Sequence, residues 1–194
     1  MYLNGSGSMG FSGAKRRGEP FASFGFPPNI WRMNNSFERE MVMCMNRFFT
    51  ENRKRGFAYR LKQSTFNTQY VDIIVDSKEP GYYLAIECKS LKGKRLSFSS
   101  NFHKDKDGVH QIDNISGFIS YTGRTGYLAA EFRGGPKNEA YLMPWSLVLE
   151  YFDSAASIPI EAFRECVVLE RIPGGYRRPA GLPAPSGRRH PHDR

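Results

Sequence analysis

The sequence predicts an α/β domain in which a central mixed β-sheet is flanked by helices. Residues 70–75 (YVDIIV) and 82–89 (YYLAIECK) are short apolar runs, and a strong turn signal at residues 77–81 separates them, so they are expected to form a hairpin. Both runs are apolar on both faces, which is typical of central strands that are covered on either side. Segments with helical spacing lie before and after this hairpin, which adds the flanking helices.

The first expected element is a helix that begins near Asn35. Asn35 and Glu38 have the spacing of a capping box. Phe37, Met41 and Phe48 recur at helical spacing after this start, and they predict one buried face.

The other elements follow from periodicity and turn chemistry. Residues 57–62 alternate like a strand, residues 63–69 are polar and loop-like, and residues 92–108 are a second polar segment. The expected order is helix, three strands, helix, two strands and helix, with one further edge strand. The later elements are a helix over residues 109–121, strands over 126–132 and 139–143, a helix over 144–152 with proline in its first turn, and the edge strand over 166–171.

The net charge of +9 lies mostly at the two ends of the chain. Residues 1–30 contribute +2 and residues 173–194 contribute +4, so residues 31–172 keep only +3. Both ends are rich in residues typical of flexible segments, and GSGSM at residues 5–9 resembles an added linker before a second start methionine. We therefore expect one globular domain over residues 31–172, and a basic balance that favours a polyanionic partner.

The cysteines and the hydropathy predict a soluble protein of the cytoplasm. Cys44, Cys88 and Cys166 lie far apart in apolar runs, which favours reduced thiols over a disulfide or zinc framework. No apolar run approaches the ~20 residues that cross a membrane, and no signal-peptide pattern is present. No membrane partner is expected.

Three charged residues lie inside the two apolar runs of the hairpin, namely Asp72, Glu87 and Lys89. Because a buried charge is costly without a partner, these residues need an explanation. Glu87 and Lys89 project from the same face of their strand, with Cys88 on the other, and antiparallel pairing brings Asp72 beside Glu87. The alternative is a hairpin with one exposed face, on which the three residues form a surface charge ladder.

Two neighbouring carboxylates repel each other unless a cation lies between them, and hard oxygen ligands suit Mg²⁺ or Mn²⁺. Such an ion polarises a phosphodiester and lowers the pKa of a bound water. Lys89 would hold that water or neutralise the charge that develops on phosphorus. The spacing therefore favours a metal-dependent nuclease.

This pattern resembles the PD-(D/E)XK nuclease superfamily, and more narrowly the Holliday-junction resolvases of the archaeal Hjc and bacterial RecU kinds. Residues 37–40 (FERE) match the opening-helix motif of the archaeal enzymes, and residues 86–89 (IECK) match their Ile-Glu-x-Lys strand. The resemblance covers about residues 36–152. Segments that resemble the bacterial enzymes are residues 62–65 (KQST) leading to 70–72 (YVD), then 98–103 (FSSNFH), 110–112 (HQI) and 141–144 (YLMP).

The resemblance implies a restriction-endonuclease-like fold and a homodimer that resolves four-way DNA junctions by paired symmetric nicks. It implies that Asp72 and Glu87 bind Mg²⁺, for which Mn²⁺ would substitute, and that the Cys88 main-chain carbonyl is a further ligand. Lys89 becomes the catalytic lysine. Glu38 becomes an acid that reaches the metal directly or through water.

Glu38 and Gln111 also have ordinary interpretations. From spacing alone Glu38 is a capping glutamate at a helix N-terminus, and Gln111 is a solvated helical side chain. The resemblance implies a catalytic role for Glu38, with Glu40 as its fallback. For Gln111 it implies an orienting or phosphate-contacting role.

Basic and polar residues near these motifs are expected to contact DNA, mostly through backbone phosphates. Each has a plain alternative as a solvated charge or as a hydroxyl that closes a turn. His103 and His110 lack partners at the spacing of a zinc site, so zinc is not expected. The expected contacts are Arg39, Arg60, Lys62, Ser64, Thr65, Lys92, Lys94, Arg95 and His103.

Two departures from the family pattern leave other functions open. Val71 replaces the proline that names the superfamily, and only residues 63–69 separate the first two strands, so the stalk of the bacterial resolvases is absent. One alternative is a restriction- or repair-type nuclease that cuts linear or flap DNA, and another is a catalytically silent DNA-binding scaffold. A scaffold has no reason to keep a repulsive carboxylate pair. For a junction resolvase, branch-migration machinery is a further expected partner.

Overall fold

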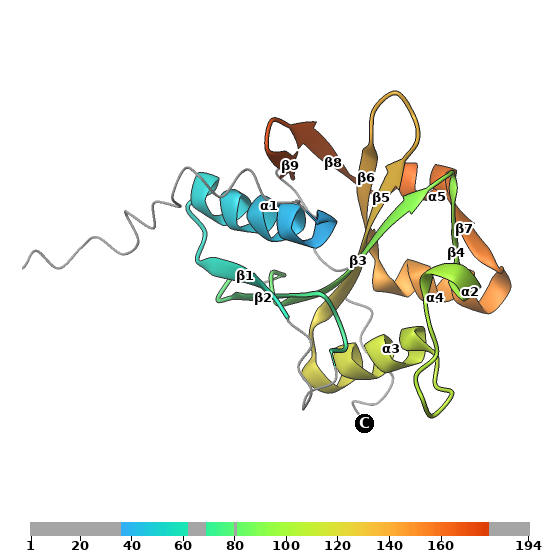
Figure 1. The fold of residues 1–194 in the computed structure, drawn as a ribbon. Coiled ribbons are helices and arrows are strands. Elements are labelled where there is room, and N and C mark those ends of the chain that lie inside the picture. Colours follow the sequence, from blue (N-terminus) through green and yellow to red (C-terminus); the bar gives the residue numbers. More distant parts are fainter. Residues whose placement is uncertain (1–35, 62–68, 80, 179–194) are drawn as a thin grey trace, which may run out of the picture. The chain divides into compact units, whose positions relative to one another are not determined.

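A seven-stranded mixed sheet forms the centre of the computed structural model, which describes residues 36–61, 69–79 and 81–178 (Figure 1). β3 and β5 run parallel, and the other neighbouring strands run antiparallel. A separate two-stranded sheet pairs β4 (Arg95–Ser97) with β7 (Ser157–Pro159). The large sheet has the order β1 (Gly56–Arg60), β2 (Ile73–Ser77), β3 (Leu84–Lys92), β5 (Thr125–Arg133), β6 (Glu139–Pro144), β8 (Val167–Ile172) and β9 (Gly175–Arg177).

Helices cover both faces of this sheet, and each face has its own hydrophobic core. α1 (Phe37–Glu51) packs on one face, where its apolar side chains meet those of β2, β3, β5, β6, β8 and β9. The other face carries α2 (Phe98–Asn101), α3 (Gln111–Thr122), α4 (Trp145–Ser154) and α5 (Ile160–Arg164). The predicted class, a central mixed sheet flanked by helices, is confirmed. None of the helices in the described ranges is long and apolar enough to span a membrane.

α1 begins one residue later than the capping-box prediction requires. Its N-cap is Ser36, in extended conformation and without a side-chain capping bond, so the predicted cap by Asn35 is wrong. Glu38 and Glu40 lie in the first turn, where negative charge is favourable to the helix dipole. The helix is therefore stabilised by its buried face rather than by a cap.

The parallel pair β3 and β5 requires a crossover, which consists of β4, α2 and α3. Gly123 ends α3 in a left-handed conformation with φ 67°. Gly126 follows on β5, where a Cβ atom would collide with Ile119 and Trp145. Glycine therefore allows α3 and α4 to lie close against β5, with the first residue of α3, Gln111, near β3.

Several expected boundaries are corrected by the structure. β3 continues to Lys92, and the polar segment 92–108 contains β4 and α2. β8 is not the edge strand, because β9 pairs with it inside the segment that composition assigns to a flexible tail. Most of the loop expected over residues 63–69, and the ends 1–30 and 179–194, lie outside the described residues.

The three cysteines are free thiols, as expected. Cys44 and Cys88 are buried and Cys166 is half-buried. Burial raises the pKa of Cys44 to about 11, and it also raises the pKa of Cys88. At neutral pH these groups are therefore protonated apolar fillers of the core.

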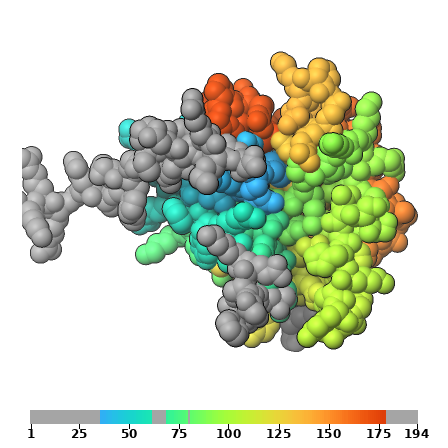
Figure 2. Space-filling view, viewed as in Figure 1, coloured from blue at the N-terminus to red at the C-terminus, as the bar shows by residue number. Residues whose placement is uncertain are grey.

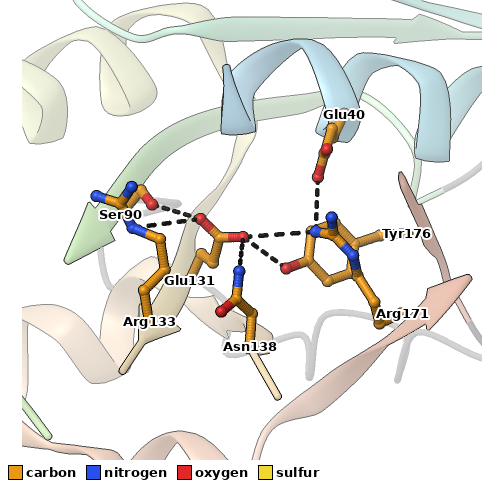
Figure 3. Close-up of polar contacts among 7 residues, drawn as sticks. All are labelled: Glu40, Ser90, Glu131, Arg133, Asn138, Arg171 and Tyr176. Atoms are coloured by element: carbon orange, nitrogen blue, oxygen red, sulfur yellow. Dashed lines mark hydrogen bonds and ion pairs between the residues drawn. The ribbon is translucent and has the colours of Figure 1, made fainter. Parts of the chain in front are cut away.

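Glu131 of β5 is a buried carboxylate that receives hydrogen bonds from two other strands and from the turn before β6 (Figure 3). Its Oε1 accepts from the Tyr176 hydroxyl at 2.7 Å and from the Asn138 amide at 3.2 Å. Its Oε2 accepts from the Ser90 hydroxyl. Sequence reasoning missed this residue, because its partners lie between 7 and 45 positions away.

Arg171 joins this carboxylate to a second one on α1 (Figure 3). Its Nη1 atom lies 3.0 Å from Glu40 Oε2 and 3.6 Å from Glu131 Oε1. Its guanidinium also lies 4.8 Å from the centre of the Tyr176 ring. Burial raises the pKa of Glu40, and the charge of Arg171 opposes this shift. The cluster therefore fixes the β8–β9 hairpin to the start of α1 and to β5.

Substitutions in this cluster should destabilise the domain, and the loss should grow with the number of buried polar groups left without a partner. Tyr176→Phe is expected to lower the free energy of unfolding by about 1–3 kcal/mol, because it removes one hydrogen bond to a buried carboxylate. Glu131→Ala is expected to cost about 3–5 kcal/mol, because it leaves the Tyr176 hydroxyl, the Asn138 amide and the Ser90 hydroxyl without their buried acceptor. Urea denaturation measures both.

The matched control is Tyr121→Phe, since Tyr121 is 94% exposed. It should change the free energy of unfolding by less than about 0.5 kcal/mol. Equal stability of the Tyr176→Phe and Tyr121→Phe variants would contradict the role given to the cluster.

Candidate active site

Asp72 and Glu87 lie side by side at the junction of β2 and β3. The register pairs Ile73 with Ile86, which places Asp72 opposite Glu87 on the same face of the sheet. Asp72 Oδ2 accepts the Cys88 N–H at 2.8 Å, and Oδ1 accepts from the Gln69 amide at 2.9 Å. The predicted proximity of the two carboxylates is therefore present in the structure.

The position of Asp72 within a strand was predicted wrongly. β2 begins at Ile73, so Asp72 directly precedes the strand. Its side chain accepts the Cys88 N–H, a donor that regular pairing gives to a backbone carbonyl. The ladder between the two strands ends where this carboxylate enters it.

Glu87, Lys89 and Gln111 form a closed triangle of polar contacts. Lys89 Nζ lies 2.7 Å from Glu87 Oε1, and the Gln111 amide donates to the same oxygen at 2.9 Å. Lys89 Nζ also donates to Gln111 Oε1 at 3.3 Å. Glu87 and Lys89 come from β3, whereas Gln111 is the first residue of α3. The crossover thus brings the predicted glutamine to the predicted carboxylate.

Phe102 packs its ring face against the Lys89 ammonium, and the sequence did not predict it as a site residue. The Lys89 ammonium lies 4.7 Å from the centre of the Phe102 ring, within the range of a cation–π contact. Phe102 is buried, and the Lys89 side chain is only 17% exposed. The aromatic face therefore limits where the ammonium can go.

Burial makes the two carboxylates resist ionisation. Burial, and then the charge of Asp72, raise the pKa of Glu87 to about 7, against the opposing effects of Lys89 and Gln111. Burial also raises the pKa of Asp72, while the hydrogen bond from Cys88 and the charge of Lys89 act in the other direction. Desolvation thus outweighs even an ammonium at 2.7 Å from Glu87.

Glu38 lies near this pair from the opposite side of the hairpin. Its charge contributes to the raised pKa values of Asp72 and Cys88. Its Oε2 atom is buried and has no hydrogen-bond partner among the described residues, and Arg60 Nη2 lies 3.9 Å from it. Glu40, the predicted fallback, pairs with Arg171 instead.

One buried and one half-buried carboxylate, Glu87 and Asp72, form a donor set of the kind that a hard cation takes. Within the described ranges no three Asp, Glu, His or Cys side chains come together as a metal cluster. Mg²⁺ does not need such a cage, because it commonly takes one or two carboxylates, several waters and a phosphate oxygen. Asp72 and Glu87 fit this requirement, and the orphaned oxygen of Glu38 adds an acceptor for a bound water.

The residues expected to contact DNA are spread along the domain. Arg60 lies at the site beside Glu38, and Arg39 is half-buried on α1. His103 is exposed, and its carbonyl accepts the Gln111 N–H at 2.8 Å. Lys62, Ser64 and Thr65 lie outside the described residues.

The basic residues after β3 lie farther from the site. Lys92, Lys94 and Arg95 are exposed, at the end of β3 and in the turn into β4. Lys92 is three residues beyond Lys89 along the strand, a distance of roughly 10 Å. Arg95 donates to Ser157 Oγ at 2.9 and 3.0 Å. Lys92, Lys94 and Arg95 are therefore placed to contact DNA that flanks the site, rather than the phosphate at the site itself.

The raised pKa of Glu87 predicts a pH dependence of stability in metal-free protein. The native state holds the Glu87 proton up to about pH 7, whereas the unfolded chain loses it near the ordinary value of 4.5. This group therefore stabilises the fold fully below pH 4.5, and the contribution is lost as the pH rises to about 7. In that window it lowers the free energy of unfolding by up to about 1.4 kcal/mol per pH unit.

Glu87→Gln removes the titratable carboxyl group, so it should make the free energy of unfolding less dependent on pH. Urea denaturation in EDTA between pH 5 and pH 8 measures it. We expect the variant to gain stability relative to the wild type as the pH rises. Parallel curves for the two proteins would show that Glu87 ionises normally.

The comparisons with known proteins give a structural likeness and no family. No protein-family model matches the chain, and no curated protein matches it. Among solved structures, the chain is similar to that of Archaeoglobus fulgidus Hjc, described as a Holliday junction resolvase from an archaeal hyperthermophile. The TM-score is 0.43 and the identity 18%, over 64% of this chain and 92% of that chain.

A likeness of this size does not by itself assign an activity. The α/β class follows from the sheet and helices described above. An acidic opening helix is followed by Asp72 at the start of one strand and by Glu87 and Lys89 in the next. The structure thus keeps the order of the motifs on which the resemblance to PD-(D/E)XK nucleases is based.

Proposed function

We propose that this chain is a metal-dependent endonuclease that hydrolyses phosphodiester bonds of DNA, with four-way junctions as its preferred substrate. One observation carries the proposal: half-buried Asp72 and buried Glu87 lie together beside Lys89, in an environment that opposes their ionisation. A purely structural site would have its charges balanced. Here a cation and an anionic phosphodiester would complete the balance.

Mg²⁺ is the proposed cation, and Mn²⁺ would substitute for it. Asp72, Glu87 and the Cys88 carbonyl would hold the ion, with Glu38 acting directly or through water. Once bound, it would polarise the phosphodiester and lower the pKa of an attacking water.

Lys89 has the position and charge to act on the phosphate. Its ammonium is paired with Glu87 and lies over the Phe102 ring, so it is held at the site without being fully neutralised. From there it would orient the attacking water or stabilise the negative charge that develops on phosphorus. Gln111 contacts both Lys89 and Glu87, and it would set the distance between them.

The electrostatics of the chain favour DNA as the polyanion. The net charge is +9. Three exposed basic residues, Lys92, Lys94 and Arg95, lie beyond Lys89 at the end of β3 and in the turn into β4. Contacts of this kind read the backbone rather than the bases, so affinity should fall steeply with salt. A symmetric pair of nicks in a junction requires two sites, for which a two-fold homodimer is the simplest arrangement.

Three substrates distinguish junction resolution from general cleavage. Incubation with a mobile four-way junction, a linear duplex and a flap, in Mg²⁺ and in EDTA, should give paired symmetric nicks in the junction alone, and none in EDTA. Equal cutting of the linear duplex would indicate a general nuclease of the same fold. Binding to all three without cleavage would indicate a DNA-binding scaffold.

Substitutions in the site should abolish cleavage without abolishing DNA binding. Asp72→Asn, Glu87→Gln and Lys89→Ala are each expected to lower the single-turnover rate by about 100-fold or more, because the first two remove a ligand of the ion that would polarise the phosphate and the third removes the ammonium beside it. Glu161→Gln, which alters an exposed carboxylate on α5, is the matched control and should cleave like the wild type.

Manganese binding separates the two kinds of residue. Titration with Mn²⁺, followed by electron paramagnetic resonance, should show weakened binding for Asp72→Asn and Glu87→Gln and retained binding for Lys89→Ala. Wild-type cleavage by either carboxylate variant would contradict the proposed metal site.

A further inference from the structure

An open hollow lies beside the candidate active site, with a volume of about 450 Å³. Residues of α2, of the loop between α2 and α3, and of the end of α4 line it. In the ribbon view these segments lie together on the α3 side of the sheet, and the space-filling view shows the α2 to α3 segment as outer surface away from α1 (Figures 1 and 2). Two of its lining residues, Phe98 and Phe102, also belong to the hydrophobic core on this face of the sheet.

Four ring systems form its walls, namely Phe98, Phe102, His110 and Phe152. The ring centres of His110 and Phe152 are 4.9 Å apart with an angle of 34° between the planes, and Phe98 meets Phe152 edge to face at 5.2 Å. Phe98 and Phe102 are buried, so the accessible aromatic surface comes mainly from the half-buried rings of His110 and Phe152. A flat aromatic guest can stack on one ring while its rim meets another.

His110, which lines the hollow, carries one polar atom besides the one that caps α3. It is the N-cap of α3, and its Nδ1 accepts the Ile112 N–H at 3.2 Å. In the neutral imidazole the proton then lies on Nε2, which makes that atom a hydrogen-bond donor. The hollow therefore combines aromatic walls with a donor of the kind that reads the edge of a nucleobase.

The charge at the rim is suited to a phosphate. Lys104 and His103 are exposed and belong to the lining, and no acidic side chain does in this described part of the chain. A guest that enters with a negatively charged backbone would place it against Lys104. Aromatic walls and a cationic rim together match a nucleotide within a strand.

The hollow and the candidate active site share a wall. Phe102 lines the hollow and lies under the Lys89 ammonium at 4.7 Å, and the His103 carbonyl accepts the N–H of Gln111. Only one ring therefore separates the hollow from the residue proposed to act on phosphorus. With the cleaved bond at Lys89, the neighbouring nucleotide is the part of the substrate that would reach the hollow.

We propose that this hollow binds one unstacked nucleobase of the DNA substrate, adjacent to the cleaved phosphodiester, with Lys104 on its phosphate. The inference rests on the proposed function and defines a subsite of it. Extracting a base from a duplex costs a few kcal/mol, and least where the base is already unpaired. A subsite of this kind would favour branch points over continuous duplex, and it would supply selectivity that the missing stalk does not.

An abasic scan tests this directly. Four-way junctions that each lack one base, at successive positions around the cleaved bond, are titrated with the full chain in EDTA so that binding is measured without cleavage. For the wild type we expect one position at which loss of the base weakens binding by about tenfold, in line with a single base–aromatic stack. Phe152→Leu should weaken binding to the intact junction by the same factor and should be insensitive to base loss at that position.

Two further variants guard against a folding artefact. Lys104→Gln changes an exposed residue and should reduce the slope of log affinity against log salt by about one phosphate contact. Tyr121→Leu removes an aromatic ring that is 94% exposed at the other end of α3, and it should bind every junction like the wild type. Thermal unfolding confirms that each variant is folded.

The outcomes separate this subsite from the proposed function. Cleavage of junctions by a wild type that is indifferent to every abasic position overturns the subsite alone. Equal sensitivity of Phe152→Leu and the wild type to base loss also overturns it. A chain that neither binds nor cleaves any of the DNA substrates overturns the proposed function and the subsite together.

Discussion

The hydrogen bond from the Cys88 N–H to the Asp72 carboxylate is the contact on which the site depends. It places a side-chain oxygen where a backbone carbonyl would continue the sheet, so β2 starts at Ile73 and the carboxylate stays beside Glu87. On its other edge, β3 pairs in parallel with β5. Because parallel strands need a crossover, the chain returns through α2 and α3, and this return delivers Phe102 and Gln111 to Lys89.

The sheet buries carboxylates on both faces, and their surroundings differ in kind. On the α1 face, Glu131 receives hydrogen bonds from Tyr176, Asn138 and Ser90, so its charge is well compensated. On the α3 face, Glu87 keeps a raised pKa in spite of Lys89. Buried polar groups that hold a fold together are normally satisfied. The hydrogen bonds of Glu131 therefore suit a role in stability, and the raised pKa of Glu87 is among the observations behind the proposed metal site.

Local patterns predicted the parts of the structure that depend on short stretches of chain. The hairpin, the opening helix and the shared face of Glu87 and Lys89 follow from periodicity and from one turn signal. The contacts that complete the site span longer separations, such as the 24 positions between Glu87 and Gln111. They depend on how closely α3 packs on β5, which Gly126 permits and which no local pattern reveals. The start of β2 was misjudged for a related reason, because Asp72 looks like a strand residue until its side chain replaces a backbone acceptor.

The ion pair of Glu40 with Arg171 joins positions that are 131 residues apart, near the first and last described elements. On a ribosome the amino-terminal helix emerges long before its partner, since synthesis is sequential and domains fold as the chain appears. The first turn of α1, which carries Glu38, acquires its clamp only when the β8–β9 hairpin has been made. A chain released early would thus lack the contact that holds the first turn of α1, and with it Glu38, near Asp72. For the proposed nuclease, the site would be complete only after the β8–β9 hairpin has been synthesised.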